Sequence, residues 1–221
     1  MEALCRIGNS TKKLVDRRKG FIGEKGIGFK SVFKVADIVH ISSSAYSFRF
    51  DSSELLGMIT PITESFPSAQ YIEGQTQMLL DLKGTSELRS INKDLHEIEP
   101  QLLIFLRKLQ KIIIHTPLVN REFEAEKTKY DEEFKGETMK LWRKELPRKK
   151  EAITKYLIVR RAAGNLPLDS RRDGVTETEI VLAFPISEYG QPLLKSQDTY
   201  AYLPIGNYGF CVRCTLTWHQ S

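Results

Sequence analysis

Apolar and polar residues alternate along much of the chain with a period of two, the pattern of half-buried β-strands. In residues 46–51, for example, Tyr46, Phe48 and Phe50 alternate with polar residues, and we interpret these aromatic side chains as sheet core. The alternation and the turn residues between the runs predict strands at 37–42, 46–50, 76–83, 112–114, 153–162 and 176–186, and a polar antiparallel meander over 119–145.

A different period marks the middle of the chain. Between Glu87 and Lys111, apolar residues recur at alternating spacings of three and four, which predicts an amphipathic helix. Pro100 interrupts the pattern, so we expect two helices, with the break at Glu99 and the proline opening the second. The apolar stripe could dock a partner helix, but we favour the interpretation that it covers a sheet of the same protein. Residues 52–73 show little periodicity, which predicts a loop.

Length and composition leave room for one large domain or two small ones. The chain has 221 residues, of which 41% are hydrophobic and 28% charged, ordinary values for a soluble globular protein. Its net charge of +5 selects no class of partner, because a mild basic excess suits nucleotides, nucleic acids and acidic proteins alike. No apolar run is long enough to cross a bilayer, no signal peptide is present, and three cysteines fit a reducing compartment. We therefore expect a cytoplasmic or nuclear protein without a membrane partner.

The densest group of glycines lies near the N-terminus. Four glycines fall between Gly20 and Gly28, and an apolar segment, residues 29–35, follows directly. Glycine lets a backbone approach a ligand closely, and a glycine-rich loop that opens a helix presents free backbone N–H groups at the positive end of the helix dipole. This arrangement suits an anion, above all a phosphate, and Lys25 and Lys30 add positive charge. The spacing matches neither the dinucleotide fingerprint nor the Walker loop, so the glycines alone leave an ordinary turn open.

The sequence that continues from these glycines favours a phosphate site over an ordinary turn. Residues 23–33 read Gly-Glu-Lys-Gly-Ile-Gly-Phe-Lys-Ser-Val-Phe, and a strand-like run over 38–50 follows. This sequence resembles the glycine box of the GHKL ATPases, in the heat-shock-chaperone branch, and it is more similar still to the box of sacsin-like and NO VEIN-like proteins. Residues 7–12 resemble the end of the helix that leads into the family's lid. Residues 76–83 resemble a strand that the family opens with a threonine at the adenine end of its nucleotide pocket.

The resemblance implies an ATP site, with Mg as its metal, that this chain contains only in part. The positions that match the family's nucleotide-binding residues are Ser10, Thr11, Lys12, Gly23, Glu24, Lys25, Gly26, Ile27, Gly28, Phe29 and Thr76. Without the family, Thr11 and Lys12 read as loop residues and Thr76 as an ordinary strand threonine. The family's catalytic glutamate and its magnesium-binding asparagine lie upstream of the position that matches Met1, so we assign no catalytic or metal-binding residue. Whether the chain is an enzyme stays open, and we expect it to be inactive alone.

We interpret the chain as a fragment of such an ATPase. The resemblance implies an α+β fold, in which residues 1–115 form a partial Bergerat-type α/β sandwich, a mixed sheet with helices on one face. Residues 116–221 would begin a β-rich second domain like the chaperone's middle domain. The implied partners are ATP or ADP, protein clients and the missing part of the same domain. Near the C-terminus, residues 202–210 resemble family segments in weaker form, and residues 211–221 depart from them.

Two further features of the sequence, a basic segment and a cysteine pair, suggest other kinds of site. Basic residues crowd between Arg143 and Lys150 beside Trp142, so the chain could instead be a non-catalytic module that binds nucleic acid or an acidic protein through this segment. We favour a solvated face there. Cys211 and Cys214 have the spacing of a zinc or redox site, but a structural zinc needs four ligands and no second cysteine pair is present, so we expect no metal.

Overall fold

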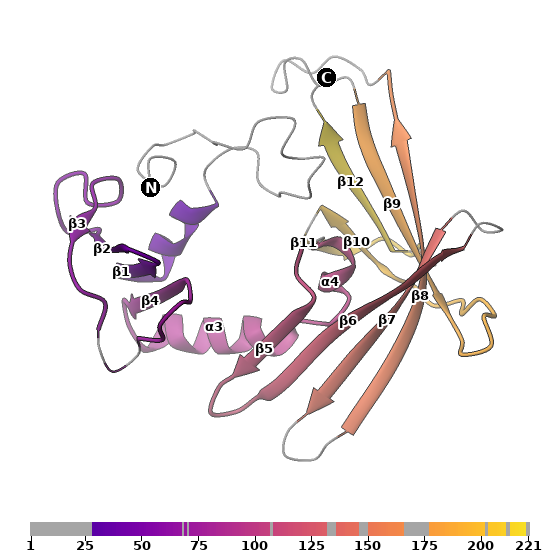
Figure 1. Ribbon diagram of the computed structural model, residues 1–221, viewed down its shortest axis with the longest axis horizontal. Helices are drawn as coiled ribbons and strands as arrows, with labels where there is room; N and C mark the ends of the chain where they lie inside the picture. Colours follow the sequence, from indigo (N-terminus) through magenta and orange to yellow (C-terminus); the bar gives the residue numbers. More distant parts are fainter. Residues whose placement is uncertain are drawn as a thin grey trace. The chain divides into compact units, whose positions relative to one another are not determined.

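The computed structural model describes residues 28–67, 69, 71–106, 108–131, 136–145, 150–165, 177–201, 203–210 and 213–219. The chain divides into two compact units, with the described residues up to Asp94 in the first and those from Leu95 onward in the second. Figure 1 labels the strands and the α-helices of both units.

The first unit is built on a four-stranded antiparallel sheet with the strand order β3-β2-β1-β4. A short 3-10 helix, η1, leads into the central strand β1, and most of the helix α3 belongs to the same unit. The elements are η1 (Phe29–Lys34), β1 (Ala36–Ser43), β2 (Tyr46–Asp51), β3 (Ile62–Thr63), β4 (Gln77–Leu82) and α3 (Thr85–Glu97).

One face of this sheet is apolar and carries η1. Side chains alternate between the two faces of a strand, so alternate residues of β1 and β2 meet on the same side. Phe33 of η1 lies edge-on to Phe50 of β2, with ring centroids 6.4 Å apart. The predicted use of Phe48 and Phe50 as sheet core is confirmed, whereas Tyr46 is exposed. The core consists of Phe33, Ala36, Val39, Ile41, Phe48 and Phe50, with Phe29, Val32, Leu80 and Leu82 packed against it.

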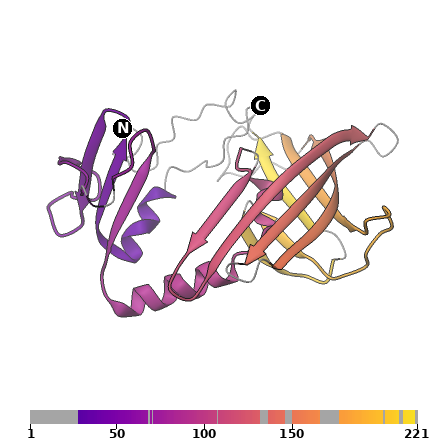
Figure 2. The same ribbon diagram turned by 60° about the horizontal axis from the view of Figure 1, so that its bottom comes forward.

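The second unit contains an eight-stranded sheet with the order β11-β10-β12-β9-β8-β7-β6-β5. Neighbouring strands are antiparallel except β10 and β12, which are parallel. Figure 2 shows how strongly its long strands twist. The elements are α4 (Leu102–Phe105), β5 (Lys111–His115), β6 (Asn120–Asp131), β7 (Gly136–Glu145), β8 (Lys150–Ala163), β9 (Glu177–Ile186), β10 (Asp198–Ala201), β11 (Leu203–Asn207) and β12 (Arg213–His219).

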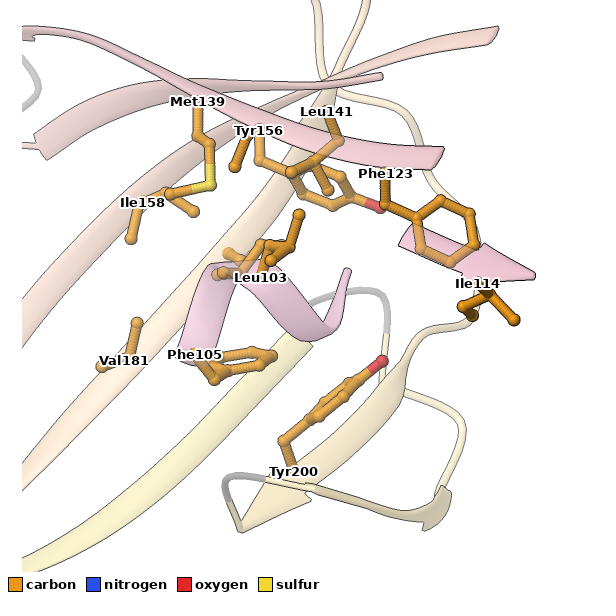
Figure 3. Packing of buried hydrophobic residues seen from close by; sticks show 13 residues of the cluster. Leu103, Phe105, Ile114, Phe123, Met139, Leu141, Tyr156, Ile158, Val181 and Tyr200 are labelled. Atoms are coloured by element: carbon orange, nitrogen blue, oxygen red, sulfur yellow. The ribbon is translucent and has the colours of Figure 1, made fainter. Parts of the chain in front are cut away.

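The core of the second unit forms where α4 packs on one face of this sheet (Figure 3). Every side chain in the middle of α4 is buried, and the ring of Phe105 lies 4.5 Å from that of Tyr200 in β10, measured between centroids. The strands contribute alternate residues to the same side. The buried cluster comprises Leu103, Ile104, Phe105, Ile114, Phe123, Ala125, Met139, Leu141, Tyr156, Ile158, Val181, Ala183 and Tyr200.

The predicted fold class is wrong. We expected an α+β fold with a partial Bergerat-type sandwich, a mixed sheet with helices on one face, but the described chain is mostly strand and its sheets are almost wholly antiparallel. Antiparallel strands need only turns between them, whereas parallel strands need crossover connections that are usually helices. The expectation of helices covering a sheet came from the resemblance. The period-two alternation, taken by itself, predicts β1, β2 and β4 to β9, but not β10, β11 and β12, nor β3, which lies in the segment predicted as a loop.

The helical segment also differs in part from its prediction. The break near Pro100 is confirmed, because it separates α3 from α4. The second helix does not reach Lys111, however: the backbone leaves helical geometry at Leu106, with φ −89° and ψ 82°, and three consecutive isoleucines favour the strand β5. No residue of α3 is buried, so the apolar stripe does not cover a sheet along its length. Only its C-terminal end, through Leu95, packs against the core of the second unit.

Candidate functional site

The predicted nucleotide site is described only at its edges. Eight of its residues lie outside the described part of the chain: Ser10, Thr11, Lys12, Gly23, Glu24, Lys25, Gly26 and Ile27. Gly28, Phe29 and Thr76 lie within it, all in the first unit.

Gly28 ends the glycine-rich loop and begins η1. Its carbonyl oxygen accepts hydrogen bonds from the backbone N–H of Ser31 at 3.3 Å and from the Ser31 hydroxyl at 2.7 Å. The backbone of Gly28 is right-handed helical, with φ −56° and ψ −45°, which any L-residue adopts. A Cβ atom built on Gly28 meets nothing within 4 Å. Neither backbone conformation nor packing against the described chain therefore requires glycine at this position.

Phe29 anchors the end of the loop to the sheet. Its ring centroid lies 5.5 Å from that of Phe50 in β2 and 6.1 Å from that of Phe33 in η1. Contacts of this length between tilted or edge-on rings are favourable beyond the apolar area that they bury. Phe29 thus holds the start of η1 against the sheet, a role that the sequence pattern of the glycine box does not reveal.

The ammonium group of Lys30, which the sequence predicts as a source of positive charge at the loop, lies over two aromatic rings. The Nζ atom lies 4.8 Å from the ring centroid of Phe50 and 5.2 Å from that of Phe29. It also donates a hydrogen bond to the backbone carbonyl of Met58. Cation–π contacts of this kind stabilise a charged group over an aromatic face. Lys30 therefore contributes to the aromatic core of the first unit.

Thr76 lies at the far end of the same sheet. Its hydroxyl is 2.7 Å from the hydroxyl of Ser43, the last residue of β1, and the next residue, Gln77, pairs with Ser42. Ala36, which follows η1 by two residues, is at the opposite end of β1, and seven residues of strand span about 23 Å. Thr76 and the start of β1 are therefore at opposite ends of the sheet.

A polar network that sequence reasoning missed covers the face of the sheet opposite η1. The Arg49 guanidinium lies 3.0 Å from Glu64, and His40 lies between Glu64, at 3.9 Å, and Asp81, at 3.6 Å. Asp51 accepts hydrogen bonds from the backbone N–H and the hydroxyl of Ser53, and these hold the pKa of its carboxyl below the ordinary value. The alternation in β2 did indicate a polar face, but the approach of Glu64 from the loop after β3 carries no sequence signal.

The basic segment is partly neutralised by neighbouring carboxylates. The Arg143 guanidinium forms ion pairs with Glu145 and with Glu99, the latter at 3.1 Å. The Lys144 ammonium lies 3.7 Å from Glu122. Arg148 and Lys149 lie outside the described residues.

Within the part of the chain that the structure describes, no group of three or more histidine, cysteine, aspartate or glutamate side chains is placed to hold a metal ion. Cys211 lies outside that part of the chain and Cys214 lies in β12, so their pairing stays untested. None of the described helices is both long enough and apolar enough to cross a membrane.

Comparison with known proteins gives one clear relationship. The chain is 29% identical, over 242 aligned residues, to the protein NO VEIN of Arabidopsis thaliana. The alignment covers 95% of this chain but only 8% of that protein, so the chain corresponds to a small part of its relative's length. No family model and no solved structure matches the chain.

Proposed function

We propose that this chain is part of a larger, ATP-binding, chaperone-like ATPase of the GHKL class, and that residues 23–28 bind the phosphates of the nucleotide. The observation that carries the proposal is the surroundings of Gly28. Its backbone is helical and no atom of the described residues lies within 4 Å of the position of its Cβ atom, so the described part of the chain does not explain a glycine there. A ligand that approaches the backbone closely does explain it. The similarity to NO VEIN along nearly the whole chain supports a place within a much longer protein.

The residues of the loop suit phosphate oxygens. Backbone N–H groups between Gly23 and Gly28 supply neutral donors, and Lys25 supplies a charge at the same place. Ser10, Thr11 and Lys12 would close over the phosphates from the lid, and Thr76 would lie toward the adenine. We assign Mg no ligand in this chain, so the nucleotide would bind as its Mg complex. Hydrolysis needs a group that orients the attacking water, so we propose binding without hydrolysis by these residues alone.

Isothermal titration calorimetry of the purified chain with Mg-ATP and with ADP tests the proposal. The Gly26→Val variant should lose the heat of binding, because a branched side chain fills the space needed by the phosphates. Gly164→Val is the matched control: it adds the same side chain in the second unit, where a Cβ atom also meets nothing within 4 Å. Unchanged affinity in Gly26→Val contradicts the assignment of the loop.

A chain extended upstream should be titrated beside the original. Binding by the extended chain alone supports the site and shows that it needs upstream residues. If neither chain binds, the loop does not hold nucleotide and the proposal fails.

The alternative, an interaction module that uses residues 143–150, has less support. Arg143 and Lys144 are already paired with carboxylates, which weakens the segment as an electrostatic surface. Salt-sensitive binding that disappears when Arg148, Lys149 and Lys150 are neutralised would favour it.

A further inference from the structure

The outer face of the eight-stranded sheet, the face opposite α4, differs from strand to strand. In β6, Phe123 and Ala125 are buried toward α4, and the residues between and beside them are Glu122, Glu124 and Glu126. Such alternation is typical of an antiparallel sheet with one face packed and the other in water. The outer face of this part of the sheet is polar, so it can stay in water without a covering element.

β8 and β9 lack this alternation. Their residues toward α4, such as Ile158 and Val181, are buried, and Figure 3 shows both on that side. The residues between them, which point to the outer face, are apolar as well and remain partly exposed. We call this set the outer apolar patch; it consists of Leu157, Val159, Ile180, Leu182, Phe184 and Ile186.

The strand register makes the patch continuous. Leu157 lies opposite Phe184, and Val159 lies opposite Leu182, so the side chains of the two strands form one surface. Strands that are apolar on both faces are typical of sheets covered on both sides. The contrast with β6 shows that the whole outer face does not share this property.

The charges around the patch indicate what covers it. At one end of the patch, Lys155 lies opposite Ile186 of β9 and opposite Lys140 of β7 in the strand register. Two ammonium groups are therefore adjacent there. Among the described residues, no carboxylate lies within ion-pair distance of Lys140 or Lys155. At the other end of the patch, Arg161 lies opposite Ile180 in the strand register, and its side chain is exposed. Glu126 of β6 lies opposite Lys140, on the side of Lys140 away from the patch. The charges directly beside the apolar residues are therefore positive, with Lys155 at one end and Arg161 at the other.

We propose that the outer apolar patch binds an amphipathic helix with acidic residues beside its apolar stripe. The distance along β8 from Lys155 to Arg161 is six residues, or about 20 Å. A helix of about 13 residues has the same length and presents apolar side chains at spacings of three and four. Its carboxylates would lie near Lys140, Lys155 and Arg161. The patch belongs wholly to the second unit, so this inference does not depend on nucleotide binding by the first.

Fluorescence anisotropy with two labelled peptides of about 18 residues tests the proposal. Both peptides carry leucines at helical spacing; the first has glutamate at the flanking positions, and the second has lysine there. The acidic peptide should bind the full chain saturably, and the basic peptide about tenfold more weakly or not at all.

Two variants locate the binding and keep the test independent of folding defects. Leu182→Glu places a charge in the patch and should weaken binding of the acidic peptide about tenfold, whereas Glu124→Lys, on the solvated half of the same face, should not weaken it. The double variant Lys140→Glu with Lys155→Glu leaves the apolar residues intact and should reverse the preference toward the basic peptide. Circular dichroism of each variant checks that the fold is retained.

Three results would overturn the proposal. The first is the absence of saturable binding by the acidic peptide to the unmodified chain. The second is a charge-swapped variant that keeps the original preference. The third is a dimer in sedimentation velocity that Leu182→Glu converts to a monomer, because a second copy of the chain would then be the occupant of the patch.

Discussion

Two glycine-to-alanine substitutions in the first unit, Gly28→Ala and Gly57→Ala, should change the stability of that unit in opposite directions. Gly28 has helical backbone angles, and an added Cβ atom meets nothing within 4 Å. A Cβ atom on Gly57 would lie 1.7 Å from the carbonyl oxygen of Asp51 and 2.8 Å from its carbonyl carbon. Both atoms belong to the backbone, so no side-chain rotation relieves the overlap. The same methyl group is thus accommodated at one position and excluded at the other.

The magnitudes follow from these surroundings. Gly28→Ala restricts the unfolded chain without strain in the folded one, so the free energy of unfolding of the first unit should rise by about 0.5–1 kcal/mol. Gly57→Ala forces the turn after β2 away from Asp51, and the free energy of unfolding should fall by about 1–3 kcal/mol, the usual cost of overpacking. The two variants should therefore differ by about 1.5–4 kcal/mol.

Native-state hydrogen exchange measured by mass spectrometry separates the two units. The two tryptophans, Trp142 and Trp218, both belong to the second unit, so their fluorescence monitors that unit during urea unfolding and should be unchanged in both variants. Protection of peptides that cover β1 and β2 should rise in Gly28→Ala and fall in Gly57→Ala. Wild-type protection in Gly57→Ala would refute the packing argument. Wild-type affinity for Mg-ATP in a stabilised Gly28→Ala variant would count against the proposed phosphate contact.

Two further predictions concern the same unit. Phe50→Ala removes the ring that contacts Phe29, Phe33 and Phe48, so exchange protection of β1 and β2 should fall by about 3–5 kcal/mol; a loss below about 1 kcal/mol would mean that the aromatic cluster does not hold η1 on the sheet. Because the pKa of Asp51 is lowered in the folded state, its carboxylate stabilises the unit above the unfolded pKa, and this contribution is lost as the pH falls through the folded pKa. Ser53→Ala removes the hydroxyl whose hydrogen bond is the largest cause of this lowering, so acid unfolding followed by amide NMR should begin at higher pH, and an unchanged midpoint would contradict this cause.

Strands such as β2 and β6 could be predicted from the sequence because each has one face against a core, whereas the short strand β3 lies in a segment predicted as a loop. The alternation that places Phe48 and Phe50 on one side of β2 is a direct consequence of that burial, and the structure confirms it. The end of the second helix could not be read in this way. Apolar residues at helical spacing continue past Phe105 to Leu109, but the isoleucines of β5 commit the following residues to a strand, and Leu109 is left exposed. Where two patterns overlap, long-range strand pairing decides the outcome, and local spacing does not report it.

The site was harder to predict from the sequence, because residues of the motif make structural contacts that the motif itself does not indicate. Phe29 and Lys30 stand inside the glycine box, yet both are held against Phe50, a residue twenty or more positions away. His40 and Glu64 approach each other across the opposite face through a loop of irregular sequence. Contacts of this kind depend on the pairing of β1, β2 and β3, so they follow from the fold and have no local pattern of their own.

The aromatic anchor also bears on how a phosphate at the loop would act on the rest of the first unit. Gly28 is adjacent to Phe29, whose ring is packed against the buried ring of Phe50 in β2. A ligand that draws the loop toward itself therefore pulls on a packed aromatic cluster, and packed cores shift between discrete arrangements more readily than they deform continuously. In the proposed site, Gly28 would leave space for the ligand, while the ring of Phe29 holds the start of η1 against the sheet. An open position and a packed one are thus adjacent in the sequence.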